Sequence, residues 1–303
     1  MKQLLFILPL FLFAACKPKP KAEVAADTRT SGQVRMLVDE SFSNVLADQI
    51  EIFKLDYPDT KFELIQGNEN KILPTFLNDS VRVAILSRML TPEEEQAYKK
   101  RSIPVFTTRF AIDGIAMITG NSNPDSTITA DEVVSILKAD GKSQKKLVFD
   151  NPYSSTLRYF MVLAGIKVLP KDGVYTLQNN NDVIKYVAEH KDYIGVVGVN
   201  WLIQDNRDVA NFTSEIKVLA VKNTKGKPGD DAFYKPSQKN LIDGIYPFLR
   251  NVYIINAEGK NGLGTGFATW LVSQRGQLIV LKSGLGPNKM VPRDLNIRTK
   301  NKN

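Results

Sequence analysis

The sequence predicts an α/β protein with two lobes, each built on a mostly parallel sheet with helices on both faces. Segments typical of strands and of helices alternate along most of the chain, which indicates α/β layers. The strand segments are almost continuously apolar, as expected for parallel strands buried on both faces. The length of 303 residues suits two units of about 100–150 residues each.

The first part of the chain alternates between strand and helix patterns. The helix predicted over Phe42–Tyr57 has apolar residues such as Leu46 and Ile50 on one face, and Pro58 ends it. Thr91 caps the start of another helix, because a Pro and three acids follow it. A short helix covers Lys71–Asn78, and the predicted strands are Val34–Val38, Phe62–Ile65, Val81–Leu86, Val105–Arg109 and Ile112–Thr119.

The same alternation continues to the end of the chain. A capping box from Thr129 to Glu132 opens a helix over Val133–Lys138, and Asp150–Ser155 forms a polar turn. One long helix is predicted over Gly262–Leu281. The remaining predicted elements are the strands Leu147–Phe149, Ile194–Val199, Ile216–Ala220 and Tyr246–Ile255, the helices Thr156–Leu163 and Asn181–His190, and the loop Gly226–Ala232.

The composition excludes several classes of chemistry. A single Cys rules out an internal disulfide and a Cys-cluster metal site, and the one His, His190, is predicted on a solvated helix end. Most Ser-His-Asp, Cys-His and His-zinc sites are therefore excluded, and we expect no catalytic residue, no metal and no cofactor. The 40 basic and 32 acidic residues give a net charge of +8, which favours anionic partners in general.

The N-terminus predicts export and attachment to a membrane. Residues 1–15 read as a signal peptide, with Lys2, an apolar run over Leu4–Phe13 that is too short to span a bilayer, and two Ala residues. Cys16 follows at once, and the stretch resembles a bacterial lipobox, although Phe13 stands where that pattern prefers Leu. We expect Cys16 to be lipidated; the alternative is a secreted protein with an incidental Cys.

Polar, structureless stretches are predicted at both ends of the folded part. Residues 16–32 are rich in Pro and Lys and read as a tether, and residues 298–303 as a solvated tail. The protein is therefore expected in the cell envelope, on the periplasmic side, anchored to a membrane by its lipid. Nucleic acid is not an expected partner, because the basic residues of this exported chain are dispersed.

Three turns share a design suited to binding an anion: an apolar strand, a hydroxyl-rich turn and a helix start. Unpaired N–H groups and the helix dipole favour negative charge there, and the carboxyl ends of strands are where open α/β sheets bind ligands. Ser and Thr are also ordinary helix caps, so each turn alone is weak support. The candidate ligand residues are Ser41, the backbone N–H of Phe42, Ser87, Arg88, Ser154, Ser155 and Thr156.

Other patterns have simpler interpretations. The glycines of Gly262–Gly266 lack the Lys of a phosphate loop and indicate a flexible helix start. Ser154 lacks the nucleophile-elbow pattern and an identifiable base. Asp39, Glu40 and Asp113 could form an acid cluster, but capping explains them equally well, and paired carboxylates would repel an anion.

Several stretches, in order over roughly residues 33–290, resemble the phosphate-binding (PstS-like) proteins of ABC transporters. They are Asp39–Phe42, Ala84–Arg88, Leu90–Glu94, Asp113–Ile118, Asn123–Pro124, Ile128–Val133, Tyr246–Arg250, Gly266–Ala268, Gly276–Gln277 and Gly284–Pro287. The resemblance implies a type II periplasmic-binding-protein fold. It also implies that phosphate or a similar oxyanion binds between the lobes and is passed to an inner-membrane ABC permease.

One stretch departs from that family. Its members open a second-lobe helix with Arg-x-Asp-x-Ser-Gly-Thr, and here Asp150 stands at the Arg, Pro152 at the Asp and Ser155 at the Gly. Ser154 and Thr156 match the family's Ser and Thr. The lost Arg supplied charge, which Arg88 could replace, and the lost Asp accepted the proton of bound phosphate. Phosphate specificity is therefore open, while oxyanion binding is retained.

We expect a monomeric, non-enzymatic binding protein with a discontinuous first lobe. That lobe comprises residues 33–113 and 220–297, and the second lobe comprises residues 114–219. The alternative is a lipoprotein with the same fold, a degenerate pocket, and an interaction or sensing role.

Overall fold

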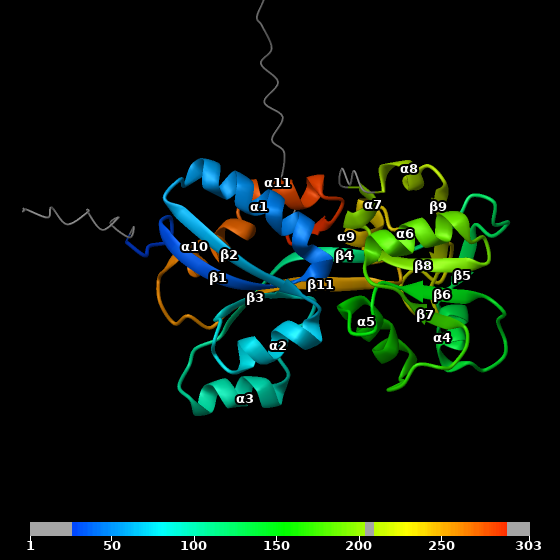
Figure 1. The fold of residues 1–303 in the computed structure, drawn as a ribbon, viewed down its shortest axis with the longest axis horizontal. Helices are drawn as coiled ribbons and strands as arrows, with labels where there is room; N and C mark the ends of the chain where they lie inside the picture. The colour runs from blue at the N-terminus through cyan, green and yellow to red at the C-terminus, as the bar shows by residue number, and fades with distance from the viewer. Residues whose placement is uncertain (1–25, 204–208, 290–303) are drawn as a thin grey trace, which may run out of the picture.

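The computed structural model describes residues 26–203 and 209–289, which form the predicted two-lobed α/β fold (Figure 1). The predicted signal peptide, Cys16 and the tail at 298–303 lie outside the described residues. Part of the predicted tether is ordered against the first lobe. Thr28 and Ser31 form an antiparallel bridge, and the Asp27 carboxylate accepts a hydrogen bond from the Leu263 N–H at 3.1 Å.

The first lobe begins with parallel strands joined by helices. β1 (Gly32–Asp39) lies between β2 (Thr60–Gly67) and β3 (Val83–Leu86) and is parallel to both. A 3₁₀ turn, η1, covers Glu40–Phe42 and leads directly into the first helix. The helices here are α1 (Ser43–Asp56), α2 (Glu69–Leu77) and α3 (Pro92–Lys100). The predicted cap Thr91 begins α3 and forms a capping box with Glu94.

Two long strands connect the lobes. β4 (Phe106–Gly120) is one strand of 15 residues, so the prediction of two separate strands over 105–119 was wrong. Its first half pairs antiparallel with β11 (Leu249–Asn256), and its second half with β8 (Tyr193–Gly198). Because β4 has partners along nearly its whole length, a polar residue such as Asp113 does not interrupt it. In the described ranges, a single ten-stranded sheet therefore runs through both lobes.

The second lobe surrounds a mostly parallel set of strands. β6 (Lys146–Phe149) lies between β8 and β7 (Val174–Thr176) and is parallel to both. The helices that cover it include α4 (Ala130–Lys138), α5 (Ser155–Ala164) and α6 (Asn180–Glu189). The short elements are β5 (Thr127–Thr129), α7 (Asn200–Ile203), α8 (Ala210–Thr213), β9 (Ile216–Val218), β10 (Ala220–Lys222) and α9 (Gln238–Ile242).

Packing in the second lobe extends beyond residue 219, where the sequence analysis places the return to the first lobe. β10 pairs in parallel with β5, and Leu241, Tyr246 and Phe248 belong to the same buried cluster as Phe160. We therefore propose that the chain returns to the first lobe near Leu249, where β11 begins. Residues 114–248 would then form the second lobe.

The C-terminal part of the first lobe consists of two helices rather than one. α10 (Leu263–Leu271) ends at Val272, and the Ser273 hydroxyl caps α11 (Gln274–Lys282) by accepting a hydrogen bond from the Gly276 N–H at 3.2 Å. The prediction of a single helix over 262–281 was therefore wrong. A Cβ at Gly276 would lie 2.3 Å from the Trp270 carbonyl oxygen, so this close corner requires glycine. β12 (Gly286–Pro287) then pairs with β4.

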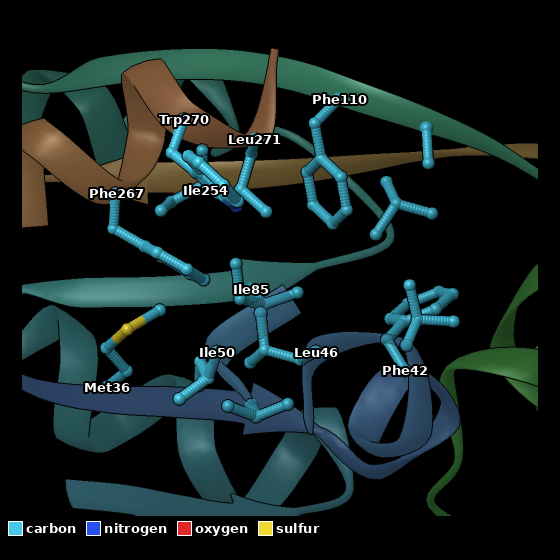
Figure 2. Packing of buried hydrophobic residues seen from close by; sticks show 14 of the residues in the cluster. Met36, Phe42, Leu46, Ile50, Ile85, Phe110, Ile254, Phe267, Trp270 and Leu271 are labelled. Atoms are coloured by element: carbon cyan, nitrogen blue, oxygen red, sulfur yellow. The ribbon is translucent and has the colours of Figure 1, made fainter. Parts of the chain in front are cut away.

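The core of the first lobe fixes the start of α1. Figure 2 shows Met36, Ile50, Ile85 and Phe267 converging on one apolar cluster between the sheet and its helices. Phe42, the residue before α1, belongs to the same cluster and is buried. The turn that follows β1 is thus held by packing. Among the described residues, no helix has both the length and the apolar character needed to cross a membrane.

Candidate functional site

Two of the three predicted turns, the one at Ser41–Phe42 and the one at Ser154–Thr156, meet where the lobes contact each other. We call this contact region the junction. Ser41 follows β1 in the first lobe, and its hydroxyl lies 3.3 Å from that of Ser155, at the start of α5 in the second lobe. Ser154 caps α5 by accepting a hydrogen bond from the Leu157 N–H at 3.1 Å. Ser41, Ser154, Ser155 and Thr156 are all buried. The structure therefore brings together four of the predicted hydroxyl residues.

The positive charge at this junction comes from Arg250, the first buried residue of β11. Its Nη1 donates hydrogen bonds to the hydroxyls of Ser155 at 3.0 Å and Thr156 at 3.1 Å. Its Nε donates to the Asp113 carboxylate at 2.6 Å, and its guanidinium carbon lies 4.8 Å from the centre of the Phe42 ring. Among the described residues, Arg250 is the only Lys or Arg that is buried.

Arg250 is not among the candidate residues predicted from the sequence, although the sequence contains a signal for it. Arg250 closes the Tyr246–Arg250 stretch that carries part of the family resemblance, and together with Asn251 it interrupts the apolar run of the predicted strand Tyr246–Ile255. A charged side chain at a buried position of a strand needs a partner. Asp113 is such a residue in the neighbouring strand, and Arg250 and Asp113 face each other in the β4–β11 register.

Three buried aspartates surround this Arg. Asp39 ends β1, Asp113 lies in β4, and Asp150 follows β6; each has no exposed surface. Burial raises the pKa of Asp39, and it raises the pKa of Asp150 to about 6. Burial disfavours the charge of Arg250, but the nearby carboxylates of Asp113 and Asp39 outweigh that effect and raise its pKa. The acid cluster considered from the sequence thus includes Asp39 and Asp113.

Several polar atoms at this junction are buried and have no hydrogen-bond partner among the residues that the structure describes. They are one carboxylate oxygen each of Asp39, Asp113 and Asp150, the Asn200 carbonyl oxygen Oδ1, and Arg250 Nη2. Buried polar atoms are nearly always hydrogen-bonded, so these atoms indicate a place for a polar ligand. A Cβ at Gly198 would lie 2.7 Å from Asn200 Oδ1 and 3.6 Å from Arg250 Nη2, so glycine keeps that space open.

Further contacts hold the lobes together around Ser41. The Asn200 side chain donates to the Ser41 carbonyl at 3.0 Å, and the Trp201 indole N–H donates to the same oxygen at 3.2 Å. The Asn151 amide also donates to the Glu40 carboxylate. Asn151, Asn200 and Trp201 belong to the second lobe, so the lobes are closed against each other.

The third predicted turn, Ser87–Arg88, is engaged in a hydrogen bond and ion pairs with other side chains. The Ser87 hydroxyl accepts a hydrogen bond from Arg158 Nη2 at 3.0 Å. Arg88 Nε pairs with Glu69 at 2.8 Å, and its Nη1 pairs with Glu94 at 2.7 Å. All three guanidinium nitrogens of Arg88 donate to oxygens of the first lobe, because Nη2 also donates to Glu94 at 2.9 Å. The structure therefore does not place Arg88 with the hydroxyls of α5.

The remaining candidates lie away from the junction. His190 is exposed at the end of α6 and stacks on Tyr186, with 4.0 Å between ring centres. Within the described ranges, no group of three or more His, Cys, Asp or Glu residues is placed to hold a metal ion. A cavity of about 500 Å³ lies on the first lobe, lined by residues such as Phe106 and Thr265, and shares no residue with the junction.

Chemically, the junction offers one guanidinium, four hydroxyls and the start of α5 to a small polar ligand. The unpaired carboxylate oxygens offer acceptors to the same ligand. A group with both acceptor oxygens and O–H donors would satisfy both sets.

Comparison with protein families agrees with this architecture. A family model described as a PBP superfamily domain matches residues 23–275. The phosphate-binding protein PstS of Pseudomonas aeruginosa is 22% identical over 288 residues, covering 85% of this chain and 83% of the relative. Protein SphX of Synechococcus elongatus is 25% identical over 221 residues, covering 67% of this chain and 62% of the relative.

Solved structures share the fold. A protein from Clostridium perfringens, solved with bound phosphate and assigned to the phosphate ABC transporter substrate-binding proteins, superposes with a TM-score of 0.66 at 21% identity. That match covers 85% of this chain and 100% of the other. An ABC-type phosphate transport receptor from Vibrio cholerae gives a TM-score of 0.63 at 16% identity, covering 84% of this chain and 100% of the other. At these identities the likeness concerns the fold.

Proposed function

The chain belongs to the PBP superfamily, and from this premise we propose that it is a solute-binding protein that captures phosphate between its lobes for an ABC transporter. One observation carries the proposal: a buried guanidinium and the hydroxyls of both lobes converge on one helix start, beside buried polar atoms without partners. Such a set of donors suits an oxyanion. The relatives named as phosphate-binding proteins support phosphate as the oxyanion.

Arg250, rather than Arg88, supplies the positive charge in this proposal. The Arg of the family's second-lobe motif is replaced here by Asp150, and Arg250 reaches the same helix start from β11. The ligand residues proposed with it are Ser41, the Phe42 N–H, Ser154, Ser155 and Thr156. The role of Ser87 and Arg88 at the ligand stays a prediction.

Asp39, Asp113 and Asp150 determine which protonation state of an anionic ligand the site accepts. Three carboxyl groups beside a single Arg would repel a fully ionised anion, whereas a ligand that carries hydrogens can donate them to the unpaired carboxylate oxygens. Phosphate retains at least one hydrogen near neutral pH, and sulfate retains none. Asp39, Asp113 and Asp150 therefore favour phosphate over sulfate. They accept the hydrogens of bound phosphate in place of the family's motif Asp, where this chain has Pro152.

The wider role follows from the family. Closure of two lobes around a ligand gives a shape that an inner-membrane permease can distinguish from the open form. We propose that this permease is the partner, that the protein acts as a monomer without catalysis, and that a lipid on Cys16 keeps it on the periplasmic side of a membrane.

Calorimetric titration of the full chain with phosphate, sulfate and molybdate tests the proposal. We expect binding heat with phosphate and an affinity for sulfate at least about a hundredfold weaker, or about 2.7 kcal/mol. The absence of heat with all three anions would overturn the proposal and leave the interaction or sensing role. Tighter binding of sulfate than of phosphate would refute the part given to the aspartates.

A further inference from the structure

A second charged junction joins the lobes beside the proposed ligand site. Glu69, at the start of α2, has a side chain that is only 2% exposed, and it pairs with two arginines. Its Oε1 accepts from Arg88 at 2.8 Å, and its Oε2 accepts from Arg158 at 2.9 Å. A carboxylate this deeply buried needs such compensation, and the two arginines come from different lobes.

The two arginines differ in how firmly they are held. Arg88 belongs to the first lobe, like Glu69, and its outer nitrogens are fixed by Glu94. Arg158 is on α5 of the second lobe, which faces α2 across the junction (Figure 1). Its Nη2 contacts Glu69 and Ser87, both in the first lobe, while its buried Nε has no hydrogen-bond partner in the described part of the chain. Separation of the lobes would release Arg158 and leave Glu69 paired with Arg88.

Arg158 is also placed to control the ligand site. It lies in the first turn of α5, two residues after Thr156, on the helix whose start carries the proposed oxyanion donors. A bond that fixes Arg158 to Glu69 therefore fixes the position of Ser155 and Thr156 relative to β1. No hydrogen bond of Arg158 to the side chains of that donor set is observed, so its effect would pass through the position of α5.

We propose that Arg158 is a positioning residue whose ion pair with Glu69 latches the two lobes and seats the start of α5 against the first lobe. The latch favours the closed form even before a ligand binds, and it slows release of the ligand. The effect on release rests on the proposed phosphate site; the effect on closure does not. Because Arg158 is 34% exposed, salt weakens the latch by screening.

The chain contains its own reporter of closure. It has two Trp residues. Trp201 donates across the lobes to the Ser41 carbonyl, whereas Trp270 lies in the first-lobe core and donates to Gln49 at 3.1 Å. Opening of the lobes exposes Trp201 to water and leaves Trp270 unchanged, so a red shift of the fluorescence reports opening.

The test compares Arg158→Ala with wild type in the full chain. Without ligand, we expect a red-shifted emission for the variant, and a shift of the wild type in the same direction as salt rises. With inorganic phosphate, stopped-flow release should be about tenfold faster, or about 1.4 kcal/mol. Arg158→Lys should restore part of both effects. Arg35→Ala is the matched control, because it removes an ion pair with Glu63 inside one lobe.

The outcomes separate the latch from the phosphate site. Unchanged emission and unchanged release in Arg158→Ala would overturn the latch, and so would equal effects in Arg35→Ala. If the wild type binds no phosphate, the Trp emission of the ligand-free proteins and its salt dependence still test whether the latch exists. Circular dichroism checks that each variant is folded. If Arg158→Ala is unfolded, Glu69→Gln replaces it, because this change keeps the shape of the side chain and removes the charge shared with Arg158. Glu69→Gln must then show the same red shift of the Trp emission.

Discussion

Arg250 combines two duties, because the guanidinium that contacts Ser155 and Thr156 also neutralises Asp113. Arg250→Lys keeps the charge, but a single ammonium group cannot reproduce contacts made by two different guanidinium nitrogens. We expect this variant to bind phosphate at least tenfold more weakly, a loss of about 1.4 kcal/mol, as measured by calorimetry.

Arg88→Ala is the comparison for that change. Its guanidinium is used by Glu69 and Glu94, and Glu69 keeps Arg158 when Arg88 is removed. The loss of phosphate affinity should therefore be smaller than in Arg250→Lys. A larger loss of phosphate affinity in Arg88→Ala than in Arg250→Lys would indicate that Arg88, as the sequence predicts, is the cation that binds phosphate.

Asp150 makes stability depend on pH. Its pKa is about 6 in the folded chain, above that of an unfolded Asp, because it is buried. The folded state therefore holds a proton that the unfolded state has lost, and stability falls as pH rises from about 4 to 6. Asp150→Asn removes this cost and should raise the free energy of unfolding at pH 8 by about 3 kcal/mol at most.

The measurement is chemical denaturation of wild type and Asp150→Asn between pH 4 and pH 8. The gain should shrink to about 0.5 kcal/mol at pH 4, where Asp150 is protonated in the folded state but still partly ionised in the unfolded chain. Asp192→Asn, at an exposed position just before β8, controls for the change of residue type. A constant difference across the whole range would contradict the burial argument.

Local sequence patterns indicated only part of the proposed site. Ser41, Ser154, Ser155 and Thr156 were predicted as candidates because a strand, a hydroxyl-rich turn and a helix start follow each other along the chain. Arg250 was not, since its partner Asp113 is 137 residues away in sequence. Such a pairing depends on the β4–β11 register, which no local pattern defines.

At the scale of elements, the corner between α10 and α11 depends on one hydroxyl. Ser273 caps α11 through the Gly276 N–H. Ser273→Ala should lower the free energy of unfolding by about 1 kcal/mol, because that N–H loses its acceptor. Denaturant titration measures this, with exposed Ser214→Ala as the control that should change little. An equal loss in both variants would show that the cap contributes nothing specific.

The same corner shows why some elements were predicted wrongly. The apolar period of residues 262–281 continues through Ser273, so the sequence favours one helix, and the break follows from packing of Gly276 against Trp270. β4 shows the opposite error. The sequence pattern predicts two strands over residues 105–119, but pairing with β11 and β8 joins them into one. The start of α3, marked by a cap, and the strand β3, marked by a continuous apolar run, were predicted within a few residues.

For the whole molecule, a ligand held by both lobes should stabilise the fold. Phosphate at a hundred times its Kd should raise the free energy of unfolding by about 2.7 kcal/mol, because only the folded protein holds the site. Thermal denaturation with and without phosphate measures this, and sulfate at the same concentration is the control. Equal stabilisation by both anions would indicate a general salt effect.

The insertion of the second lobe between β4 and β11 sets an order of events during folding. The second lobe draws its strands from one continuous stretch, whereas β3 must wait for β11, whose Tyr253 pairs with Leu86. Such distant pairings form slowly. As the chain emerges N-terminus first, its opening third remains without β11, the strand that lies between β3 and β4, until residue 256 has been made. That third is therefore the longest exposed to chaperones and proteases, and the second lobe matures before it.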